Sequence, residues 1–205
     1  RTITPQLKVS NNSLLILIDL GQGKNRLGGS CLAQVYSRSL GEPADVENPF
    51  CLKDFFNAVT ELKSLDKIMA YHDRSDGGLF ATLSEMAFAG NMGVNIDLKT
   101  ASKEESLSLL FAEEAGAVIQ INSSDLKLVM ETLKKYSLDQ SAVVIGETTP
   151  SKQITIKTNH ADAEIFDLRA LREMWSELSF RMQSLRDNPE SAKEAFNSLL
   201  DEDNP

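Results

Sequence analysis

The side chains best suited to chemistry in this chain are gathered in one short segment, Tyr-His-Asp-Arg-Ser-Asp-Gly-Gly-Leu at residues 71–79. An apolar run typical of a strand leads to Asp73, and a carboxylate at a strand end is a suitable ligand for Mg²⁺. Gly77 and Gly78 precede a run typical of a helix, and the amides of such a turn can bind an anion. The hydroxyl of Ser75 can reach a phosphate oxygen. The segment therefore predicts a magnesium ligand at Asp73 and nucleotide contacts at Ser75, Gly77 and Gly78.

Each of these residues also has a plain structural role open to it. Asp73 or Asp76 could cap the following helix, and Ser75 could bond to its own backbone. His72, one of two histidines, could bind a phosphate, orient Asp73 or transfer protons, or it could simply be a satisfied histidine at a strand end. His160 lies in a polar stretch and is expected at the surface. We favour the metal role for Asp73 and a capping or turn-forming role for Asp76.

A second cluster follows the first apolar run of the chain. Gly28, Gly29 and Ser30 form a glycine-rich loop to which Lys24 and Arg26 add positive charge. A strand, a glycine loop and a helix in this order can present backbone amides to an anion, and a bare tight turn is the alternative. Ser30 is also placed to cap a short helix. The glycines match neither a dinucleotide-binding fingerprint nor a Walker pattern.

The composition indicates a soluble globular protein and argues against a nucleic-acid partner. The 205 residues carry 21 basic and 30 acidic side chains, a net charge of −9, with no basic block to neutralise phosphates. The cysteines, Cys31 and Cys51, form no CxxC pair, so we expect two buried thiols in a reducing cytosol rather than a zinc site. We recognise no signal peptide, and no apolar run approaches the ~20 residues of a membrane span. We therefore expect a cytoplasmic protein that binds no membrane.

Hydrophobic patterning predicts strands and helices that alternate along the chain. Residues 13–20 are aliphatic enough for a strand buried on both faces, and residues 93–98 alternate like a strand with one buried face. Apolar residues at helical spacing mark residues 52–62. The elements show no regular βαβ repeat, so we expect an α+β fold with helices on the faces of a mixed sheet. Further strands are predicted at 68–72, 117–121, 142–145 and 153–157, and further helices at 30–36, 78–89, 104–111 and from Ser123 or Ser124 onwards.

The character of the chain changes after residue 166. Apolar residues at helical spacing, among them Trp175, predict one long amphipathic helix; Asn188-Pro189 ends it, and a second helix is predicted at 190–200. We therefore expect a domain at 1–166 and a helical appendage at 167–205, which packs on this domain or on a neighbour, with Trp175 in a packing role. The chain begins without methionine and ends in the acidic stretch 201–205, so we expect a piece of a longer polypeptide.

Segment 71–79 resembles the H-D-x-S-D-G-G-L signature of the C-terminal domain shared by aminoimidazole ribonucleotide synthase and its relatives. Three further motifs follow in the family's order: Leu-Gly-Gly-Ser at 27–30, Leu-Phe-Ala-Glu-Glu-Ala-Gly at 110–116, and Leu-Arg-Glu-Met-Trp-Ser-Glu-Leu-Ser at 171–179. Together they are similar to the large single-chain phosphoribosylformylglycinamidine synthases of purine biosynthesis, over nearly the whole chain. The resemblance points to the second of two such domains in that family, followed by helices that lead towards a glutaminase domain.

The resemblance implies a glutamine-dependent ligase that uses ATP and Mg²⁺ to convert formylglycinamide ribonucleotide to formylglycinamidine ribonucleotide. Asp73 and Ser75 would serve an auxiliary, structural Mg–ADP site, and the loop at 28–30 would face a ribonucleotide phosphate. Glu113 would bond substrate or order the cleft, with a solvated helix-end glutamate as the alternative. Other synthase-like domains and the glutaminase domain of the same polypeptide would be its partners. Alone, this stretch is expected to be inactive, with no catalytic residue of its own.

Two other interpretations stay open. The chain could be the same domain of another relative, such as aminoimidazole ribonucleotide synthase, selenophosphate synthetase or thiamine monophosphate kinase. It could also be a non-catalytic scaffold, in which the glycine turns are structural and the acidic surface and C-terminal helices dock neighbours.

Overall fold

A seven-stranded mixed β-sheet forms the centre of the protein in a computed structural model of the chain, which describes residues 2–10, 12–100 and 102–199. Its strands are β1 (Ser13–Asp19), β2 (Ala70–Asp73), β3 (Gly93–Leu98), β4 (Gly116–Asn122), β5 (Ala142–Thr149), β6 (Gln153–Thr158) and β7 (Glu164–Asp167). Across the sheet they lie in the order β2-β4-β1-β5-β3-β6-β7. The pair β3 and β6 is parallel and the other neighbouring pairs are antiparallel. The α+β fold with a mixed sheet is therefore confirmed.

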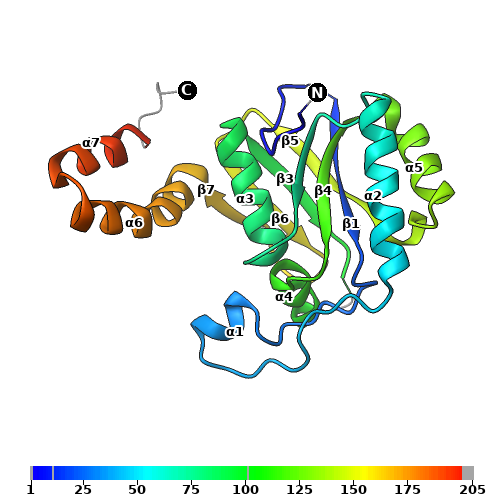
Figure 1. Cartoon of the computed structure of the whole chain (residues 1–205), viewed down its shortest axis with the longest axis horizontal. Coiled ribbons are helices and arrows are strands. Elements are labelled where there is room, and N and C mark those ends of the chain that lie inside the picture. Colours follow the sequence, from blue (N-terminus) through cyan, green and yellow to red (C-terminus); the bar gives the residue numbers. More distant parts are fainter. Residues whose placement is uncertain (1, 11, 101, 200–205) are drawn as a thin grey trace.

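Helices cover parts of both faces of this sheet. The α-helices are α1 (Cys31–Val35), α2 (Pro49–Ser64), α3 (Gly78–Gly90), α4 (Lys103–Phe111), α5 (Leu126–Lys135), α6 (Leu168–Arg186) and α7 (Pro189–Leu199). Figure 1 shows α3 on one side of the strands and α2 with α5 on the other. The predicted helix end at Leu200 and the acidic stretch 201–205 lie outside the described residues.

Strand β1 lies between the two hydrophobic cores of the protein. Leu15 and Leu17 pack into the core beneath α3, whereas Ile16 and Ile18 pack into the core beneath α2 and α5. All four side chains are at most 1% exposed. Successive residues of a strand point to opposite faces, so a run without polar residues is what a strand between two cores requires. The predicted strand buried on both faces is confirmed.

The core beneath α2 and α5 covers only the half of the sheet formed by β2, β4 and β1. On the other half, Asn95 and Asp97 of β3 are exposed while the alternate residues of that strand are buried, as its sequence pattern predicts. Val144 of β5 and Ile165 of β7 are 39% and 60% exposed. One half-face of the sheet therefore carries no helix of the described chain.

The starts of two helices test the predicted caps. Ser30 Oγ accepts a hydrogen bond from the backbone N–H of Ala33 at 3.3 Å, so the predicted cap of α1 is confirmed. The prediction that Ser123 or Ser124 caps α5 is wrong. Both serines lie in a 3₁₀ turn, Ser123–Asp125, that precedes α5, and the helix begins without a side-chain cap.

Two expectations about burial fail in α1 and α2. Leu52 and Phe56 belong to the apolar pattern of α2, but they are 44% and 70% exposed because α2 buries a narrower stripe than its sequence presents. Cys31 and Cys51 are free thiols, but each is only half-buried. Their burial was wrongly predicted because both lie in the first turn of a helix, α1 and α2 respectively, that emerges from a surface loop.

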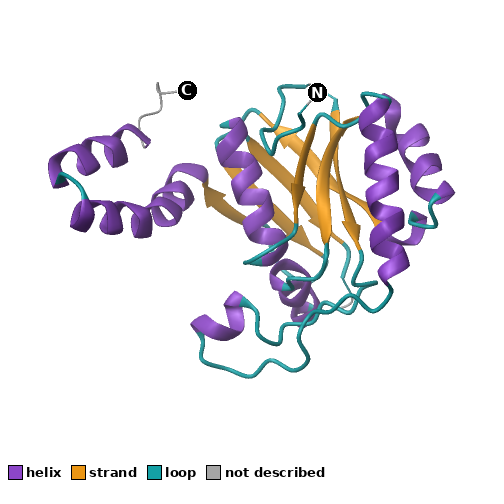
Figure 2. Cartoon of the chain, viewed as in Figure 1, coloured by secondary structure: helices purple, strands orange, loops and turns teal. Residues whose placement is uncertain are grey.

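The last two helices form a hairpin, the C-terminal arm (residues 168–199), which extends away from the sheet in Figures 1 and 2. The sequence did not predict β7, a four-residue edge strand that pairs with β6 and leads directly into the arm. Phe180 and Phe196 stack with ring centroids 4.6 Å apart and join the two helices. The two-helix arrangement agrees with the sequence, whereas the domain boundary after residue 166 stays a prediction.

Most of the amphipathic stripe on α6 is open to solvent. Leu168, at the start of the helix, is buried in the core beneath α3, but Leu178 is 68% exposed and Leu185 is 90% exposed. Trp175 packs its ring beside Phe88 at a centroid distance of 5.9 Å, yet it remains 62% exposed. Its packing role is therefore only partial, because α6 leaves the body of the protein after its first turns. None of the described helices is both long and apolar enough to cross a membrane.

Candidate functional site

Three chain segments meet at one edge of the sheet. Strands β1 and β2 both pair antiparallel with β4, which lies between them, so their C-terminal ends meet the N-terminal end of β4. In this register Asp19 lies opposite Gly116, and Asp73 lies opposite Ala117. The loop after β1, the turn after β2 and the segment before β4 are therefore side by side. Figure 2 shows long loops gathered at this end of the sheet.

The turn after β2 is built on two glycines with left-handed backbone. Gly77 has φ of +82° and Gly78 has φ of +66°, a region in which only glycine is free of Cβ strain. The Gly78 N–H donates to the carbonyl of Ser75 at 2.9 Å and closes the turn. Asp76 lies inside this turn, but α3 begins at Gly78 without a side-chain cap, so the predicted capping role of Asp76 is wrong and only its turn position is confirmed. The nucleotide contacts of Ser75, Gly77 and Gly78 stay predictions.

We predict that Gly78→Ala destabilises the protein far more than Gly23→Ala. A Cβ at Gly78 would lie 2.8 Å from the carbonyl oxygens of Leu110 and Ala112, whereas a Cβ at Gly23 would meet nothing within 4 Å. Both glycines have positive φ, so each substitution costs about 1–2 kcal/mol of backbone strain. Gly78→Ala adds about 1–3 kcal/mol for overpacking. Urea unfolding measures both, and equal losses would contradict the close packing of the turn on α4.

The glycine loop before α1 is tied to the chain that follows it. Gly28 N–H donates to the carbonyl of Glu42 at 2.8 Å, and a Cβ at Gly28 would lie 2.3 Å from a backbone oxygen. Ser30 is buried, and its hydroxyl donates to the carbonyl of Leu27 at 2.7 Å. Gly29 is exposed, with open space where a side chain would point. Of the three residues, Gly29 is thus the most accessible to a ligand, and phosphate binding by this loop stays a prediction.

Glu113 joins the two clusters that the sequence singled out. Its Oε1 atom accepts one hydrogen bond from the Cys31 N–H of α1 and another from the Gly77 N–H of the turn, both at 2.8 Å. Glu113 is half-buried, so it is not the solvated helix-end glutamate of the alternative interpretation. One carboxylate oxygen therefore fixes the distance between the glycine loop and the Asp-Gly-Gly turn. Of the roles proposed for Glu113, this arrangement favours that of ordering the cleft.

The Cys31 thiol lies beside this junction. One ligand atom from each of Cys31, Asp76 and Glu113 falls within 4.8 Å of the others. Burial, followed by a hydrogen bond to Glu113, raises the pKa of the Cys31 thiol above its ordinary value. The thiol is therefore held in its protonated form at neutral pH, which is unfavourable for a metal-binding thiolate.

A buried network of charged side chains, which was not predicted from the sequence, supports the same edge. Arg74 is 4% exposed and forms an ion pair with Asp19, whose two carboxylate oxygens also accept the N–H groups of Gly21 at 3.1 Å and Gly23 at 2.7 Å. Arg74 Nε also donates to the carbonyl of Glu114 at 2.7 Å. The positions of Arg74 after one strand and Asp19 at the end of another are the signal that could have suggested the pair.

Glu114 holds the loop after β1 in place through Arg26. Its carboxylate is fully buried and accepts both the Nε and the terminal N–H of Arg26 at 2.8 Å, and the Arg26 backbone N–H at 3.0 Å. Burial alone would raise the pKa of Glu114, but the hydrogen bonds and charge of Arg26 outweigh it and hold the pKa below its usual value. Arg26, which the sequence offered as a phosphate-binding charge, is thus already paired.

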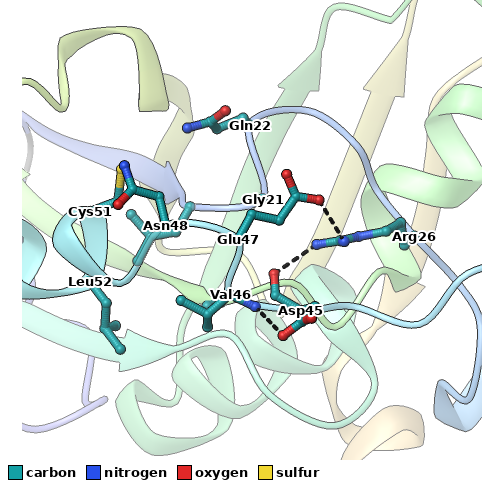
Figure 3. A pocket seen from close by; sticks show the side chains of 11 residues that line it. Gly21, Gln22, Arg26, Asp45, Val46, Glu47, Asn48, Cys51 and Leu52 are labelled. Atoms are coloured by element: carbon teal, nitrogen blue, oxygen red, sulfur yellow. Dashed lines mark hydrogen bonds and ion pairs between the residues drawn. The ribbon is translucent and has the colours of Figure 1, made fainter.

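The cavity beside Arg26 is too small for a nucleotide. Figure 3 shows Arg26 reaching towards Glu47 and the backbone of Asp45, with Cys51 on the far wall. The cavity holds about 20 Å³, enough for a single water. A larger hollow of about 610 Å³ lies next to it, on the side of Asp19 and the uncovered half-face of the sheet.

Asp73 and Ser75 lie on the open side of the turn. The Asp73 side chain is 67% exposed, and Ser75 is also exposed. His72 is largely buried beside them: its Nε2 contacts Glu85 Oε2 at 2.7 Å, and its Nδ1 lies 3.6 Å from Asp73 Oδ1. An accessible carboxylate oxygen is the kind of ligand that Mg²⁺ prefers, so the donor set fits that ion, with further ligands required from elsewhere. His160 is exposed, as predicted.

Comparison with known proteins identifies a matching family and solved structures of similar fold. Residues 12–159 match the family described as AIR synthase related protein, C-terminal domain. The fold is similar to that of Thermotoga maritima PurL complexed with ATP, at 15% identity and a TM-score of 0.62, over 81% of this chain and 27% of that one. Phosphoribosylformylglycinamidine synthase II of the same organism gives 15% identity and 0.60, over 81% and 27%. Escherichia coli HypE, a hydrogenase maturation protein, gives 20% and 0.55, over 81% and 52%. The chain thus spans about a quarter of the two Thermotoga chains.

Proposed function

This chain belongs to the AIR synthase related protein family, whose C-terminal domain it carries, and on that premise we propose that it forms part of a magnesium–nucleotide site in a phosphoribosylformylglycinamidine synthase. The proposed enzyme is a cytoplasmic ligase that converts formylglycinamide ribonucleotide, glutamine and ATP to formylglycinamidine ribonucleotide, ADP, phosphate and glutamate. Asp73 is the proposed magnesium ligand and Ser75 the proposed nucleotide contact. The similarity to a PurL protein that was solved with ATP supports nucleotide binding.

One observation carries the proposal. Glu113 holds the Gly28–Ser30 loop and the Asp-Gly-Gly turn together, through Cys31 N–H and Gly77 N–H, next to the exposed Asp73 carboxylate. The proposed metal ligand, a hydroxyl and two glycine loops thus meet at one edge of the sheet. Such a grouping suits an anionic ligand that carries its own metal, because the carboxylate can take the metal and the exposed Ser75 hydroxyl can donate to a phosphate oxygen.

The chemistry assigned to these residues is binding and orientation. Bound Mg²⁺ would neutralise charge on the nucleotide phosphates. Asp73 would hold the metal, the Ser75 hydroxyl would donate to a phosphate oxygen, and Glu113 would keep the loops at a fixed spacing. Asp19 and Arg74 would hold the strand ends beneath them. We assign no catalytic step to this chain, and we place it at the auxiliary ADP site rather than the site of turnover.

Other domains of the same polypeptide are the proposed partners, namely further synthase-like domains and a glutaminase domain. The small cavity beside Arg26 supports this view, because its volume of about 20 Å³ cannot hold a nucleotide. The exposed stripe on α6, which includes Leu178 and Leu185, offers an apolar surface for a neighbouring domain. We therefore expect the 205-residue chain alone to be inactive and to bind ATP weakly at most.

The test is Asp73→Ala in the full-length protein, with Asp162→Ala as the matched control on an exposed loop far along the chain. The proteins are denatured, and the released nucleotide and magnesium are quantified alongside synthase turnover. We expect Asp73→Ala to lose bound Mg–ADP while it keeps part of its turnover. Loss of a residue that only orients a metal ligand lowers metal affinity roughly 10–100-fold. Loss of Asp73, as a direct ligand, should lower the affinity for Mg–ADP by more than that.

Other outcomes identify other roles. Unchanged ADP content with turnover abolished would move Asp73 to the catalytic site. Unchanged ADP, magnesium and turnover would leave Asp73 as a residue without a role in ligand binding, and not as a helix cap, because α3 begins without a side-chain cap. That last result would favour the scaffold interpretation.

A further inference from the structure

A chain of contacts leads from the C-terminal arm to Asp73. Trp175 on α6 donates its indole N–H to Glu85 Oε1 at 3.1 Å, and Glu85 lies on α3. The other carboxylate oxygen of Glu85, Oε2, contacts His72 Nε2 at 2.7 Å. His72 precedes Asp73 in β2, and its Nδ1 lies 3.6 Å from Asp73 Oδ1. Four side chains from three elements are therefore arranged in series.

The chemistry of the groups fixes the direction of each contact. An ionised carboxylate only accepts hydrogen bonds, and an indole N–H only donates. The proton in the contact with Glu85 therefore lies on His72 Nε2. The ring is held by that bond with its opposite nitrogen, Nδ1, towards Asp73. This nitrogen is buried and has no hydrogen-bond partner in the described chain.

We propose that Glu85 and Trp175 are positioning residues of the Asp73 site, which orient the imidazole of His72 so that its Nδ1 can accept a hydrogen bond from a water bound at Asp73. The inference rests on the proposed role of Asp73 as a magnesium ligand. Partners of this kind orient metal ligands and the waters around them in many metal sites. Since Trp175 belongs to the arm, contacts that shift the arm would also shift the site.

The position of Trp175 favours this role over simple packing. The indole is 62% exposed and its ring has one aromatic neighbour, Phe88, so its buried area is small for a tryptophan. Its N–H nevertheless meets the one carboxylate that also holds His72. The side chain of Glu85 is 35% exposed. Either of its two hydrogen bonds can therefore be removed by a substitution that leaves no cavity in the core.

The test measures the affinity of the full-length protein for Mg–ADP after three changes: Glu85→Gln, Trp175→Phe and both together. Trp175→Phe keeps an aromatic ring beside Phe88 but removes the N–H. Glu177→Gln is the matched control, because Glu177 also lies on α6 and pairs with Arg181 at the surface. We expect Glu85→Gln to weaken Mg–ADP binding by roughly 10-fold or more, Trp175→Phe to weaken it by less, and the double variant to match Glu85→Gln.

This non-additivity is the readout that a merely structural role would not produce. Wild-type affinity in Glu85→Gln would overturn the inference, and so would additive effects of the two substitutions. Thermal unfolding of each variant shows whether a loss of affinity reflects a loss of fold, which would also count against the inference.

A second measurement separates this inference from the proposed function. Ring-¹⁵N histidine labelling of the 205-residue chain gives signals from only two residues, His72 and His160, and His160→Gln assigns them. We expect a protected Nε2–H signal for His72 that Glu85→Gln removes without any metal present. An unprotected Nε2 in the wild type would overturn the inference. A protected Nε2 together with unchanged Mg–ADP affinity in Asp73→Ala would instead overturn the proposed function.

Discussion

Glu114→Ala is expected to lower the free energy of unfolding by about 3–5 kcal/mol, because it leaves a nearly buried guanidinium without its partner. The Glu114 side chain is fully buried, and that of Arg26 is 10% exposed. The carboxylate accepts three hydrogen bonds from Arg26 and fixes the loop that carries Gly28 and Gly29. Urea unfolding followed by circular dichroism measures the loss.

Glu47→Ala is the matched control, because Glu47 contacts the same guanidinium from the surface. Arg26 lies 3.1 Å from Glu47 Oε1, and the Glu47 side chain is 52% exposed. Exposed pairs contribute about 0–1 kcal/mol, so this variant should stay near wild-type stability. Equal losses of stability in the two variants would contradict the view that burial is what makes the Glu114–Arg26 pair contribute more than the Glu47–Arg26 pair.

The same pair predicts a pH dependence. The pKa of Glu114 lies below the usual 4.5 in the folded protein, so the folded state binds its proton less readily than the unfolded state does. Its stabilisation is therefore complete above about pH 4.5 and is lost as the pH falls through the lower folded pKa. Glu114→Gln should lose stability less steeply than wild type below about pH 4.5, and parallel curves would contradict the depressed pKa.

Arg74→Met is expected to cost about 3–5 kcal/mol as well, since it leaves the Asp19 carboxylate without its cation. Arg74 also donates to the carbonyl of Glu114, and that acceptor would lose its partner. The side chain of Arg74 is fully buried, and methionine keeps much of its volume, so the loss reports on charge and hydrogen bonds rather than on a cavity. Thermal and urea unfolding measure it.

Two variants check the cause of that loss. Arg38→Met removes an exposed arginine and should leave stability nearly unchanged. Asp19→Asn in the Arg74→Met background removes the unpaired charge and should recover part of the loss. The recovery is only partial because Gly21 and Gly23 donate to different oxygens of Asp19, and the single amide oxygen of asparagine can accept only one of these N–H groups. No recovery would mean that the damage lies in the backbone contacts of Arg74 rather than in its pair with Asp19.

Much of the local structure followed from the sequence, because it is set by nearest neighbours. The aliphatic run at 13–20 predicted a doubly buried strand, and the alternation at 93–98 predicted a strand with one open face; both are found. Ser30 was predicted to cap α1 and does so. The predicted turn around Gly77 and Gly78 lies between β2 and α3.

The errors lie where the structure depends on backbone geometry or on contacts that the sequence pattern does not show. Asp76 was expected to cap α3 or to form the turn, and it forms the turn, because two left-handed glycines start that helix without a side-chain cap. The four-residue β7 was not predicted because an edge strand of that length exists only through its pairing with β6. The apolar stripe on α6 was correctly predicted, but the sequence pattern alone did not indicate that the helix would leave the sheet after its first turns.

The sequence by itself determined which residues bring carboxylates, hydroxyls and glycines to the ends of strands, because that order is written along the chain. Tertiary structure alone decided how they meet. The register of β4 between β1 and β2 sets Glu113 between two loops that are far apart in sequence, and sets Glu114 beneath Arg26. Neighbouring glutamates thus take opposite roles, one ordering the site and one buried in a charge pair. Hydrophobic periodicity cannot tell the two glutamates apart, because strand pairing brings them to partners that lie 36 to 88 residues away in the sequence.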